Sequence, residues 1–174
     1  MKKFGLIGKQ LSHSFSKSFF HKKFNEENID ASYENYELSD LKNLRFLLEK
    51  NQICGLNVTI PYKEEVINYI DELDDTCTHI GAVNTLAPQY SGNSLVSIKG
   101  YNTDTYGFSQ SIKPYLRSYH ENVLILGTGG ASKAVSHVLK QLNLKVNYIT
   151  RKSSVDSKDF FGWNELNENM VKYH

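Results

Sequence analysis

The stretch Asn57-Val58-Thr59-Ile60-Pro61-Tyr62-Lys63 follows a short apolar run, Ile53-Cys54-Gly55-Leu56, and leads into the segment 63–70. The apolar run predicts a strand that ends in a polar turn. Pro61 cannot continue a central strand, because it has no N–H for the ladder, and it suits the first turn of a helix. We therefore predict a strand and a short helix, joined at the edge where open α/β sheets bind ligands. Taken alone, the stretch fits an ordinary loop with a solvated lysine better, since surface lysines are common.

Strand and helix signals alternate on both sides of this stretch. Upstream, we predict strands at 3–8 and 33–38 and helices at 14–28 and 40–50, the second helix capped by Ser39. We interpret the aromatic residues of the first helix as core: Phe15, Phe19, Phe20 and Phe24. Downstream, the predictions are a helix at 74–80, a hairpin turn at 89–93, a strand at 95–98 and a helix at 105–116 with Pro114 in its last turn.

A second pattern begins after a polar connector. Val123-Leu124-Ile125-Leu126 is a continuous apolar run, typical of a parallel strand buried on both faces, and a glycine-rich segment and a helix follow it. The next strand is expected at 146–150. We predict an α/β domain with a mixed sheet at 1–116, followed at 117–174 by the start of a Rossmann-type, doubly wound nucleotide-binding domain.

The composition excludes several classes of protein. Of the 174 residues, 40% are hydrophobic, which is enough for a core, and the net charge is +1. A balance of this kind gives no indication of nucleic acid or a membrane surface as the main partner, and no apolar run approaches membrane-spanning length. Cys54 and Cys77 match no metal-ligand spacing, so we predict reduced thiols, no metal and a cytoplasmic location.

The glycine-rich segment is typical of a phosphate-binding turn. Gly127 would allow the tight turn, Gly129 would let the backbone approach a pyrophosphate, and a helix beginning near Gly130 would offer its N–H groups. Ser132 stands where the dinucleotide fingerprint has its third glycine, and a glycine turn without a ligand is the alternative. The next strand ends in Thr150-Arg151-Lys152, where an NAD site would have a carboxylate. Arginine can bind a 2′-phosphate, which favours NADP, although a basic pair on a solvated loop is the alternative.

Further polar residues lie near predicted element ends. Ser14 and Ser16 stand near a helix start, where they would act as caps or bind a carboxylate beside backbone N–H groups. Asn84 ends the segment 81–84. Asp104 precedes a predicted helix, so it would serve as a simple N-cap.

Five of these segments, in this order and spacing, resemble the shikimate dehydrogenase family over nearly the whole chain. The matching segments are His13-Ser14-Phe15-Ser16, Asn57-Val58-Thr59-Ile60-Pro61-Tyr62-Lys63, Gly81-Ala82-Val83-Asn84-Thr85, Asn102-Thr103-Asp104-Thr105-Tyr106-Gly107 and Gly127-Thr128-Gly129-Gly130-Ala131. The resemblance implies a substrate domain followed by an NADP-binding domain, and reversible NADPH-dependent reduction of 3-dehydroshikimate to shikimate in the pathway to chorismate and the aromatic amino acids.

The resemblance also implies residue roles. Ser14 and Ser16 would hold the substrate carboxylate, while Thr59, Asn84 and Asp104 would bind ring hydroxyls. Lys63, with Asp104 beside it, would transfer the proton, and the division between the two stays open. The cofactor would lie against the glycine-rich segment and the end of the following strand, at Gly127, Thr128, Gly129, Gly130, Ala131, Thr150, Arg151 and Lys152.

Three departures from the family pattern accompany the resemblance. The first glycine turn reads Gly8-Lys9-Gln10, where the family usually has Asn-Pro. Lys17-Ser18 replaces a proline after Ser16, so we expect Lys17 to add charge near the carboxylate site. The sequence stops at Val171-Lys172-Tyr173-His174, where the family continues, so we interpret it as lacking the C-terminal part of the family's chain. On this interpretation the chain should bind shikimate weakly without useful turnover. A quinate/shikimate dehydrogenase and a non-catalytic substrate-binding fragment are the alternatives, and oligomeric state stays open.

Overall fold

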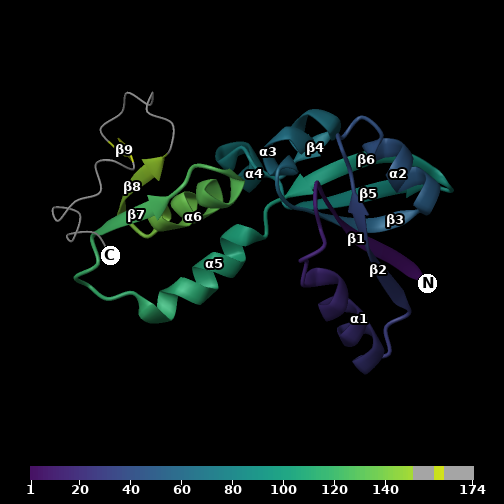
Figure 1. Ribbon diagram of the computed structural model, residues 1–174, viewed down its shortest axis with the longest axis horizontal. Coiled ribbons are helices and arrows are strands. Elements are labelled where there is room, and N and C mark those ends of the chain that lie inside the picture. The colour runs from purple at the N-terminus through teal and green to yellow at the C-terminus, as the bar shows by residue number, and fades with distance from the viewer. Residues whose placement is uncertain (151–158, 163–174) are drawn as a thin grey trace. The chain divides into compact units, whose positions relative to one another are not determined.

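The computed structural model describes residues 1–150 and 159–162, and the chain divides into two compact units, 1–102 and 103–174 (Figure 1). The sequence analysis placed the domain boundary later, at 116/117. The difference concerns helix α5 (Asp104–Ile112), which packs within the second unit, because Phe108 and Leu116 join its apolar core. A packing boundary does not define where a functional domain ends, so the division 1–116 and 117–174 stays a proposal.

The first unit alternates strands and helices. Its elements in chain order are β1 (Lys2–Gly8), α1 (Ser16–Glu26), β2 (Ala31–Glu37), α2 (Leu44–Asn51), β3 (Ile53–Val58), α3 (Tyr62–Glu65), the 3₁₀ helix η1 (Val66–Tyr69), β4 (Glu72–Leu73), α4 (Asp75–Ile80), β5 (Thr85–Ser91) and β6 (Ser94–Tyr101). The strands pair in the order β2-β1-β3-β5-β6-β4. Strand β1 runs parallel to β2 and β3, whereas β5 runs antiparallel to β3 and β6, which confirms the predicted mixed sheet.

Helices cover both faces of this sheet, with α1 on one side and α2, α3 and α4 on the other (Figure 1). Side chains alternate along β1, so Ile7 packs with Leu44 and Leu48 of α2, while Leu6 packs toward α1 with Phe24 and its neighbours. Burying both faces makes the sheet a rigid support for residues at its edge.

Two details of the helices differ from the sequence predictions. Phe15, which precedes α1 as its N-cap, is 74% exposed. Phe19 is 44% exposed, because only one stripe of α1 faces the sheet and Phe20 and Phe24 occupy that stripe. Helix α2 begins at Leu44 rather than at Asp40. The Asp40 carboxylate instead accepts a hydrogen bond from Lys42 N at 2.9 Å and holds a turn before the helix.

The second unit contains a parallel sheet, as the sequence predicted. Its described elements are α5 (Asp104–Ile112), the 3₁₀ helix η2 (Lys113–Tyr115), β7 (Asn122–Leu126), α6 (Gly130–Gln141), β8 (Lys145–Thr150) and β9 (Phe160–Gly162). Strands β7, β8 and β9 pair in that order and all run parallel. Ile125 and Val146 pack with Leu139 of α6, which gives this unit its own core.

Candidate functional site

One edge of the first sheet collects most of the predicted substrate residues. Parallel strands β1 and β3 both end there, and antiparallel β5 begins there. Thr59 N donates to Ile7 O at 2.9 Å, and Val58 N donates to Asn84 O at 2.8 Å. The backbone therefore fixes the ends of the three strands side by side, in an arrangement that matches the ligand-binding edge predicted from the sequence.

Lys63 lies on α3, directly after the turn that ends β3. Tyr62 N donates to Thr59 O at 2.9 Å, and Lys63 O accepts a hydrogen bond from Val83 N at 2.7 Å. Asn84 is buried and donates its backbone N–H to Tyr101 O at 3.0 Å. Through these backbone contacts Thr59, Lys63 and Asn84 are held in one part of the fold, and the Lys63 side chain is partly exposed.

The loop between β1 and α1 carries the two serines. Ser14 Oγ accepts a hydrogen bond from Ser16 N at 3.3 Å, and Ser14 N donates to Leu11 O at 2.9 Å. Leu11 N in turn donates to the Glu37 carboxylate at 2.6 Å, and its side chain is buried. Since Ser14 Oγ accepts from a backbone N–H, its own O–H is directed elsewhere as a donor, which suits a carboxylate ligand.

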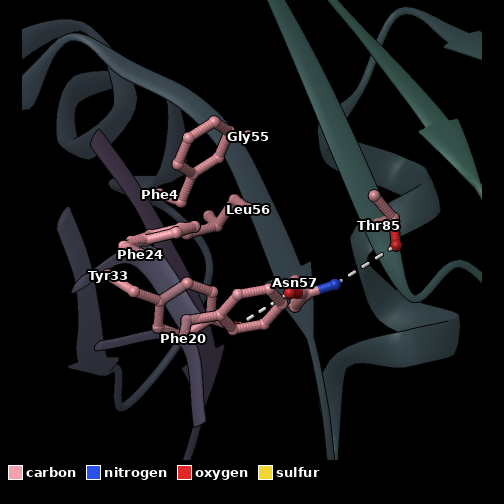
Figure 2. Close-up of a pocket in the computed structure, with 8 residues that line it drawn as sticks. All are labelled: Phe4, Phe20, Phe24, Tyr33, Gly55, Leu56, Asn57 and Thr85. Carbon is pink, nitrogen blue, oxygen red and sulfur yellow. Dashed lines mark hydrogen bonds between the residues drawn. The ribbon is translucent and has the colours of Figure 1, made fainter. Parts of the chain in front are cut away.

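A chain of side-chain hydrogen bonds runs from β2 across β3 to β5. Tyr33 OH donates to Asn57 Oδ1 at 2.8 Å, and Asn57 Nδ2 donates to Thr85 Oγ1 at 3.3 Å. Thr85 Oγ1 then donates to Asn84 Oδ1 at 2.9 Å. Tyr33, Asn57 and Thr85 line a hollow of about 250 Å³, whose other walls include Phe4, Phe20 and Phe24. Figure 2 shows these side chains around it.

Burial raises the pKa of Tyr33 to about 12, although a hydrogen bond with the Ser16 side chain acts in the opposite direction. The phenol therefore stays protonated at neutral pH and keeps its O–H as a donor to Asn57. Ser16 is thus connected, through Tyr33, to the hydrogen-bond chain that ends at Asn84.

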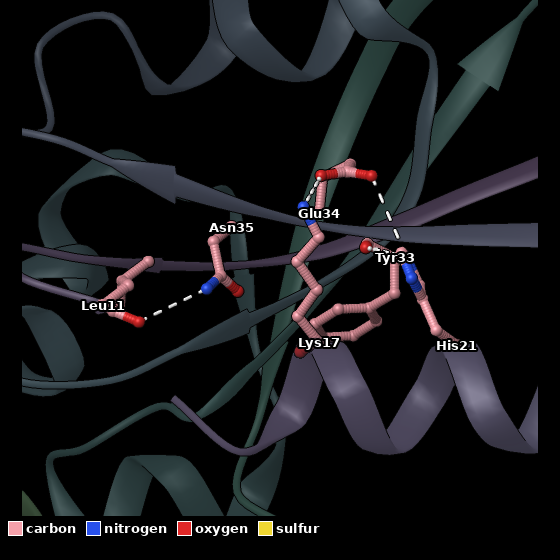
Figure 3. A network of polar contacts seen from close by, with 6 residues as sticks. All are labelled: Leu11, Lys17, His21, Tyr33, Glu34 and Asn35. Atoms are coloured by element: carbon pink, nitrogen blue, oxygen red, sulfur yellow. Dashed lines mark hydrogen bonds and ion pairs between the residues drawn. The ribbon is translucent and has the colours of Figure 1, made fainter. Parts of the chain in front are cut away.

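Lys17 does not place an uncompensated charge at this edge. Its ammonium pairs with the Glu34 carboxylate at 2.6 Å, and His21 Nε2 lies 3.8 Å from the other oxygen of Glu34 (Figure 3). Glu34 on β2 therefore offsets the charge of Lys17, and a contribution of Lys17 to the carboxylate site stays a prediction.

Asp104 and the predicted cofactor residues belong to the second unit. Asp104 is the first residue of α5, and Thr103 occupies the N-cap position without a side-chain cap, so the simple N-cap interpretation of Asp104 is wrong. The structure describes Lys63 and Asp104 in different units, and their pairing stays a proposal.

The β7–α6 turn has the geometry expected of a phosphate-binding loop. Gly127 has φ +107°, a conformation that favours glycine, and its N–H bonds to Ile149 O at 2.8 Å. Gly129 is the N-cap of α6, and an added Cβ at Gly127 or Gly129 would meet no atom within 4 Å. The segment Gly127-Thr128-Gly129-Gly130-Ala131 thus leaves room for an anion above the first turn of α6. Thr150 ends β8 and is buried, whereas Arg151 and Lys152 lie outside the described residues.

Within the described residues, no cluster of three or more His, Cys, Asp or Glu side chains could hold a metal ion. None of the helices described is both long and apolar enough to cross a membrane.

Comparison with known proteins connects this edge to one family. Residues 6–86 match the family model of the shikimate dehydrogenase substrate binding domain. A shikimate dehydrogenase (NADP(+)) from Methanosphaera stadtmanae is 38% identical over 152 residues, which cover 86% of this chain and 52% of that protein. The crystal structure of shikimate dehydrogenase 1 from Peptoclostridium difficile has a TM-score of 0.83 and 35% identity, covering 95% of this chain and 62% of that one.

The chain is thus similar to shikimate dehydrogenases over most of its length, and residues 6–86 match the substrate binding domain of that family. A further relative, shikimate 5-dehydrogenase from Thermus thermophilus, was solved in complex with NADP(H) and shikimate. It has a TM-score of 0.74 and 30% identity, covering 87% of this chain and 57% of that one. The chain spans about half the length of the curated relative from Methanosphaera stadtmanae.

Three residues of this sheet edge were absent from the predicted site: Tyr33, Asn57 and Thr85. Asn57 stands within the stretch that the sequence analysis singled out, but no role was assigned to it. Tyr33 lies 24 residues from Asn57 along the chain, so only the register of β2, β1 and β3 brings them together. No local pattern in the sequence could have identified that contact.

Proposed function

We propose that this chain carries the substrate-binding edge of a shikimate dehydrogenase, which reduces 3-dehydroshikimate to shikimate reversibly with NADPH. One observation carries the proposal most directly. The residues at 14, 16, 59, 63 and 84 lie at one sheet edge, within or directly beside the hydrogen-bonded ends of β1, β3 and β5. A ligand with a carboxylate at one end and hydroxyls on its ring suits that set of donors and acceptors.

The residue roles follow from this chemistry. Ser14 and Ser16 would hold the carboxylate, and Thr59, Asn84 and Asp104 would bind the ring hydroxyls. NADPH supplies the hydride when it is bound. Lys63 donates a proton to the ketone oxygen in the direction of reduction and accepts the hydroxyl proton in the direction of oxidation. Asp104 would orient the Lys63 ammonium and favour its charged form.

NADP is the proposed cofactor. The open space at Gly127 and Gly129, before the first turn of α6, supports binding of the cofactor pyrophosphate there. Arg151 would select the 2′-phosphate, and Thr150 and Lys152 would lie beside it. We also propose a cytoplasmic location, which the free thiols of Cys54 and Cys77 support.

Binding of shikimate to the purified 174-residue chain tests the substrate assignment. NMR titration with shikimate should shift the backbone amides of residues 14, 16, 59, 63 and 84. Lys63→Met should weaken the interaction, whereas Lys22→Met serves as control, because Lys22 forms only an exposed ion pair with Glu26 on α1. Shifts confined to other surfaces, or equal affinity of the two variants, would contradict the assignment.

Two further measurements distinguish a shikimate dehydrogenase from a quinate/shikimate dehydrogenase and from a non-catalytic substrate-binding fragment. Titration with quinate measures whether the edge prefers quinate, and a clear preference would favour a quinate/shikimate dehydrogenase. NADPH formation from NADP and shikimate, followed by absorbance, measures turnover. Binding without turnover in this chain, together with turnover in a version extended to the length of its relatives, would identify the 174 residues as a substrate-binding part.

A further inference from the structure

The hydrogen-bond chain across the first sheet has a fixed direction, and one backbone carbonyl sets it. Asn84 O lies 3.5 Å from one nitrogen of the Asn57 side chain. A carbonyl oxygen can only accept, so the Asn57 group facing it is the NH₂. The Asn57 carbonyl Oδ1 must then face Tyr33 and accept from its hydroxyl, as observed at 2.8 Å.

The same constraint passes to Thr85 and then to Asn84. Asn57 Nδ2 donates to Thr85 Oγ1 at 3.3 Å, so the single hydroxyl proton of Thr85 is directed to Asn84 Oδ1 at 2.9 Å. Because Thr85 occupies the carbonyl side of the Asn84 amide, the NH₂ group of Asn84 points the other way as a donor. The orientation of Asn84 is therefore determined by a neighbour that needs no contact with the ligand.

At the opposite end, Tyr33 is held tightly in place. Its side chain is 2% exposed, and its ring stacks on Phe20 with centroids 4.5 Å apart and planes 16° apart. With its proton directed to Asn57, the phenol oxygen of Tyr33 is left as an acceptor, and the Ser16 side chain acts on it to lower the pKa of Tyr33. An acceptor beside the Ser16 hydroxyl favours one orientation of that hydroxyl before a ligand binds.

We propose that Tyr33 and Thr85 are positioning residues of the substrate site: Tyr33 presets the Ser16 hydroxyl, and Thr85 presets Asn84 as a hydrogen-bond donor. The proposal rests on the function proposed above, since it assigns the two ends of the chain to the carboxylate and to a ring hydroxyl. It adds that the ligand oxygen facing Asn84 acts as an acceptor, which excludes an amide nitrogen or ammonium at that position of the ring.

Conservative variants of the 174-residue chain distinguish a positioning role of Tyr33 and Thr85 from a general effect on stability. Thr85→Val removes the hydroxyl at nearly constant volume, Thr85→Ser keeps it, and Tyr33→Phe removes only the phenol oxygen. Tyr90→Phe is the matched control, because Tyr90 also has a hydrogen-bonded hydroxyl in this unit, bound to Leu48 O at 2.9 Å and Ile53 O at 3.0 Å.

Two readouts are needed. The first is the NMR signals of the Asn57 and Asn84 side-chain amides in the ligand-free chain. Thr85→Val should move the Asn84 signals and Tyr33→Phe the Asn57 signals, while Thr85→Ser and Tyr90→Phe should leave both near their wild-type positions. The second is shikimate affinity, which should fall roughly three- to tenfold in Thr85→Val and Tyr33→Phe, as expected for one lost hydrogen bond.

The outcomes distinguish the two proposals. Unmoved Asn84 signals in Thr85→Val, or wild-type shikimate affinity in both Thr85→Val and Tyr33→Phe, would overturn the positioning roles. Equal loss of affinity in Tyr90→Phe would also overturn them, because it would indicate general destabilisation. A wild-type chain that does not bind shikimate would count against the proposed function, and the amide signals would still decide the direction of the hydrogen-bond chain.

Discussion

The carboxylate of Glu37, at the end of β2, accepts a hydrogen bond from the backbone N–H of Leu11 over 2.6 Å. Leu11 O accepts from Ser14 N, so Glu37 fixes the loop that carries the proposed carboxylate site. Glu37→Ala should lower the free energy of unfolding by about 1–3 kcal/mol, because a partly buried N–H loses its partner, and should also weaken shikimate binding. Urea unfolding and ligand titration measure the two effects.

Glu27→Ala is the control, because the Glu27 side chain forms only a surface ion pair with Lys23. Loss of that pair should change the free energy of unfolding by less than about 1 kcal/mol.

Gly8 separates the serine loop from the end of β3. A Cβ at this position would lie 2.6 Å from Leu11 Cδ2, 2.7 Å from Thr59 Cγ2 and 3.2 Å from Ile60 O. Gly8→Ala should therefore push the two segments apart, cost about 1–3 kcal/mol of stability and weaken shikimate binding. Gly107→Ala adds the same methyl group on α5, where it would meet no atom within 4 Å. In Gly107→Ala, the free energy of unfolding should stay the same or rise by roughly 0.5–1 kcal/mol. If both variants unfold at the same urea concentration, the close contact at Gly8 has no energetic weight.

Lys63 is expected to act in proton transfer. In a protein extended to the length of its relatives, Lys63→Ala should lower kcat roughly 10²–10⁴-fold, with a much smaller change in KM. Steady-state kinetics with shikimate and NADP measure both constants. A kcat within about twofold of the wild type would remove Lys63 from the proton-transfer role.

Arg151 is expected to distinguish NADP from NAD. Arg151→Ala should weaken NADP binding by about 1.5–3 kcal/mol and leave NAD binding nearly unchanged, because only NADP has the 2′-phosphate. Titration of the extended protein with each cofactor measures the difference. Equal weakening for both cofactors would make Arg151 structural.

The stability of the first unit should fall at alkaline pH. Burial raises the pKa of Tyr33 and of Tyr90 to about 12 and that of Cys77 to about 11, above their ordinary values of 10.0 and 9.0. Between the ordinary and the raised pKa, the unfolded chain loses a proton that the folded chain retains, so the free energy of unfolding decreases as pH rises. The decrease should begin near pH 9 with Cys77 and steepen between about pH 10 and 12 with the tyrosines.

Urea unfolding at a series of pH values tests this expectation. The double variant Tyr33→Phe, Tyr90→Phe should show a shallower fall above pH 10 than the wild type, since neither phenylalanine can ionise in the unfolded chain. Parallel curves for the two proteins would show that other groups control alkaline unfolding.

Much of the fold was predictable because it depends on local patterns. The apolar run before Asn57 and the continuous run Val123–Leu126 indicated strands that the structure confirms. The hairpin turn expected at 89–93 is shorter than predicted, because residues 89–91 still pair with β6 as part of β5. The exposure of Phe15 was not predictable in the same way. Its spacing fits a helix, but the covering of one stripe by the sheet depends on how α1 lies on β1 and β2.

The candidate site was also predictable only where it depends on local sequence. Segments that resemble one family supplied Ser14, Lys63 and Asn84, and the structure places these residues around one sheet edge. The links among them depend on strand register: Asn57 and Thr85 are 28 residues apart in sequence and meet only because β3 pairs with β5. Register is a tertiary property, so sequence periodicity could not assign Tyr33 or Thr85 to the site.

The order of strands in the first sheet also has a kinetic consequence. The β5–β6 hairpin closes through the short turn at Gly92, which is a fast local event of about 1–10 μs. Pairing of β1 with β3 is expected to be slower, because α1, β2 and α2 all lie between the two strands and this long segment must be closed into a loop. The substrate edge needs β1, β3 and β5 together, so it is completed late in folding. Shikimate should therefore slow unfolding of the chain while leaving its rate of folding nearly unchanged.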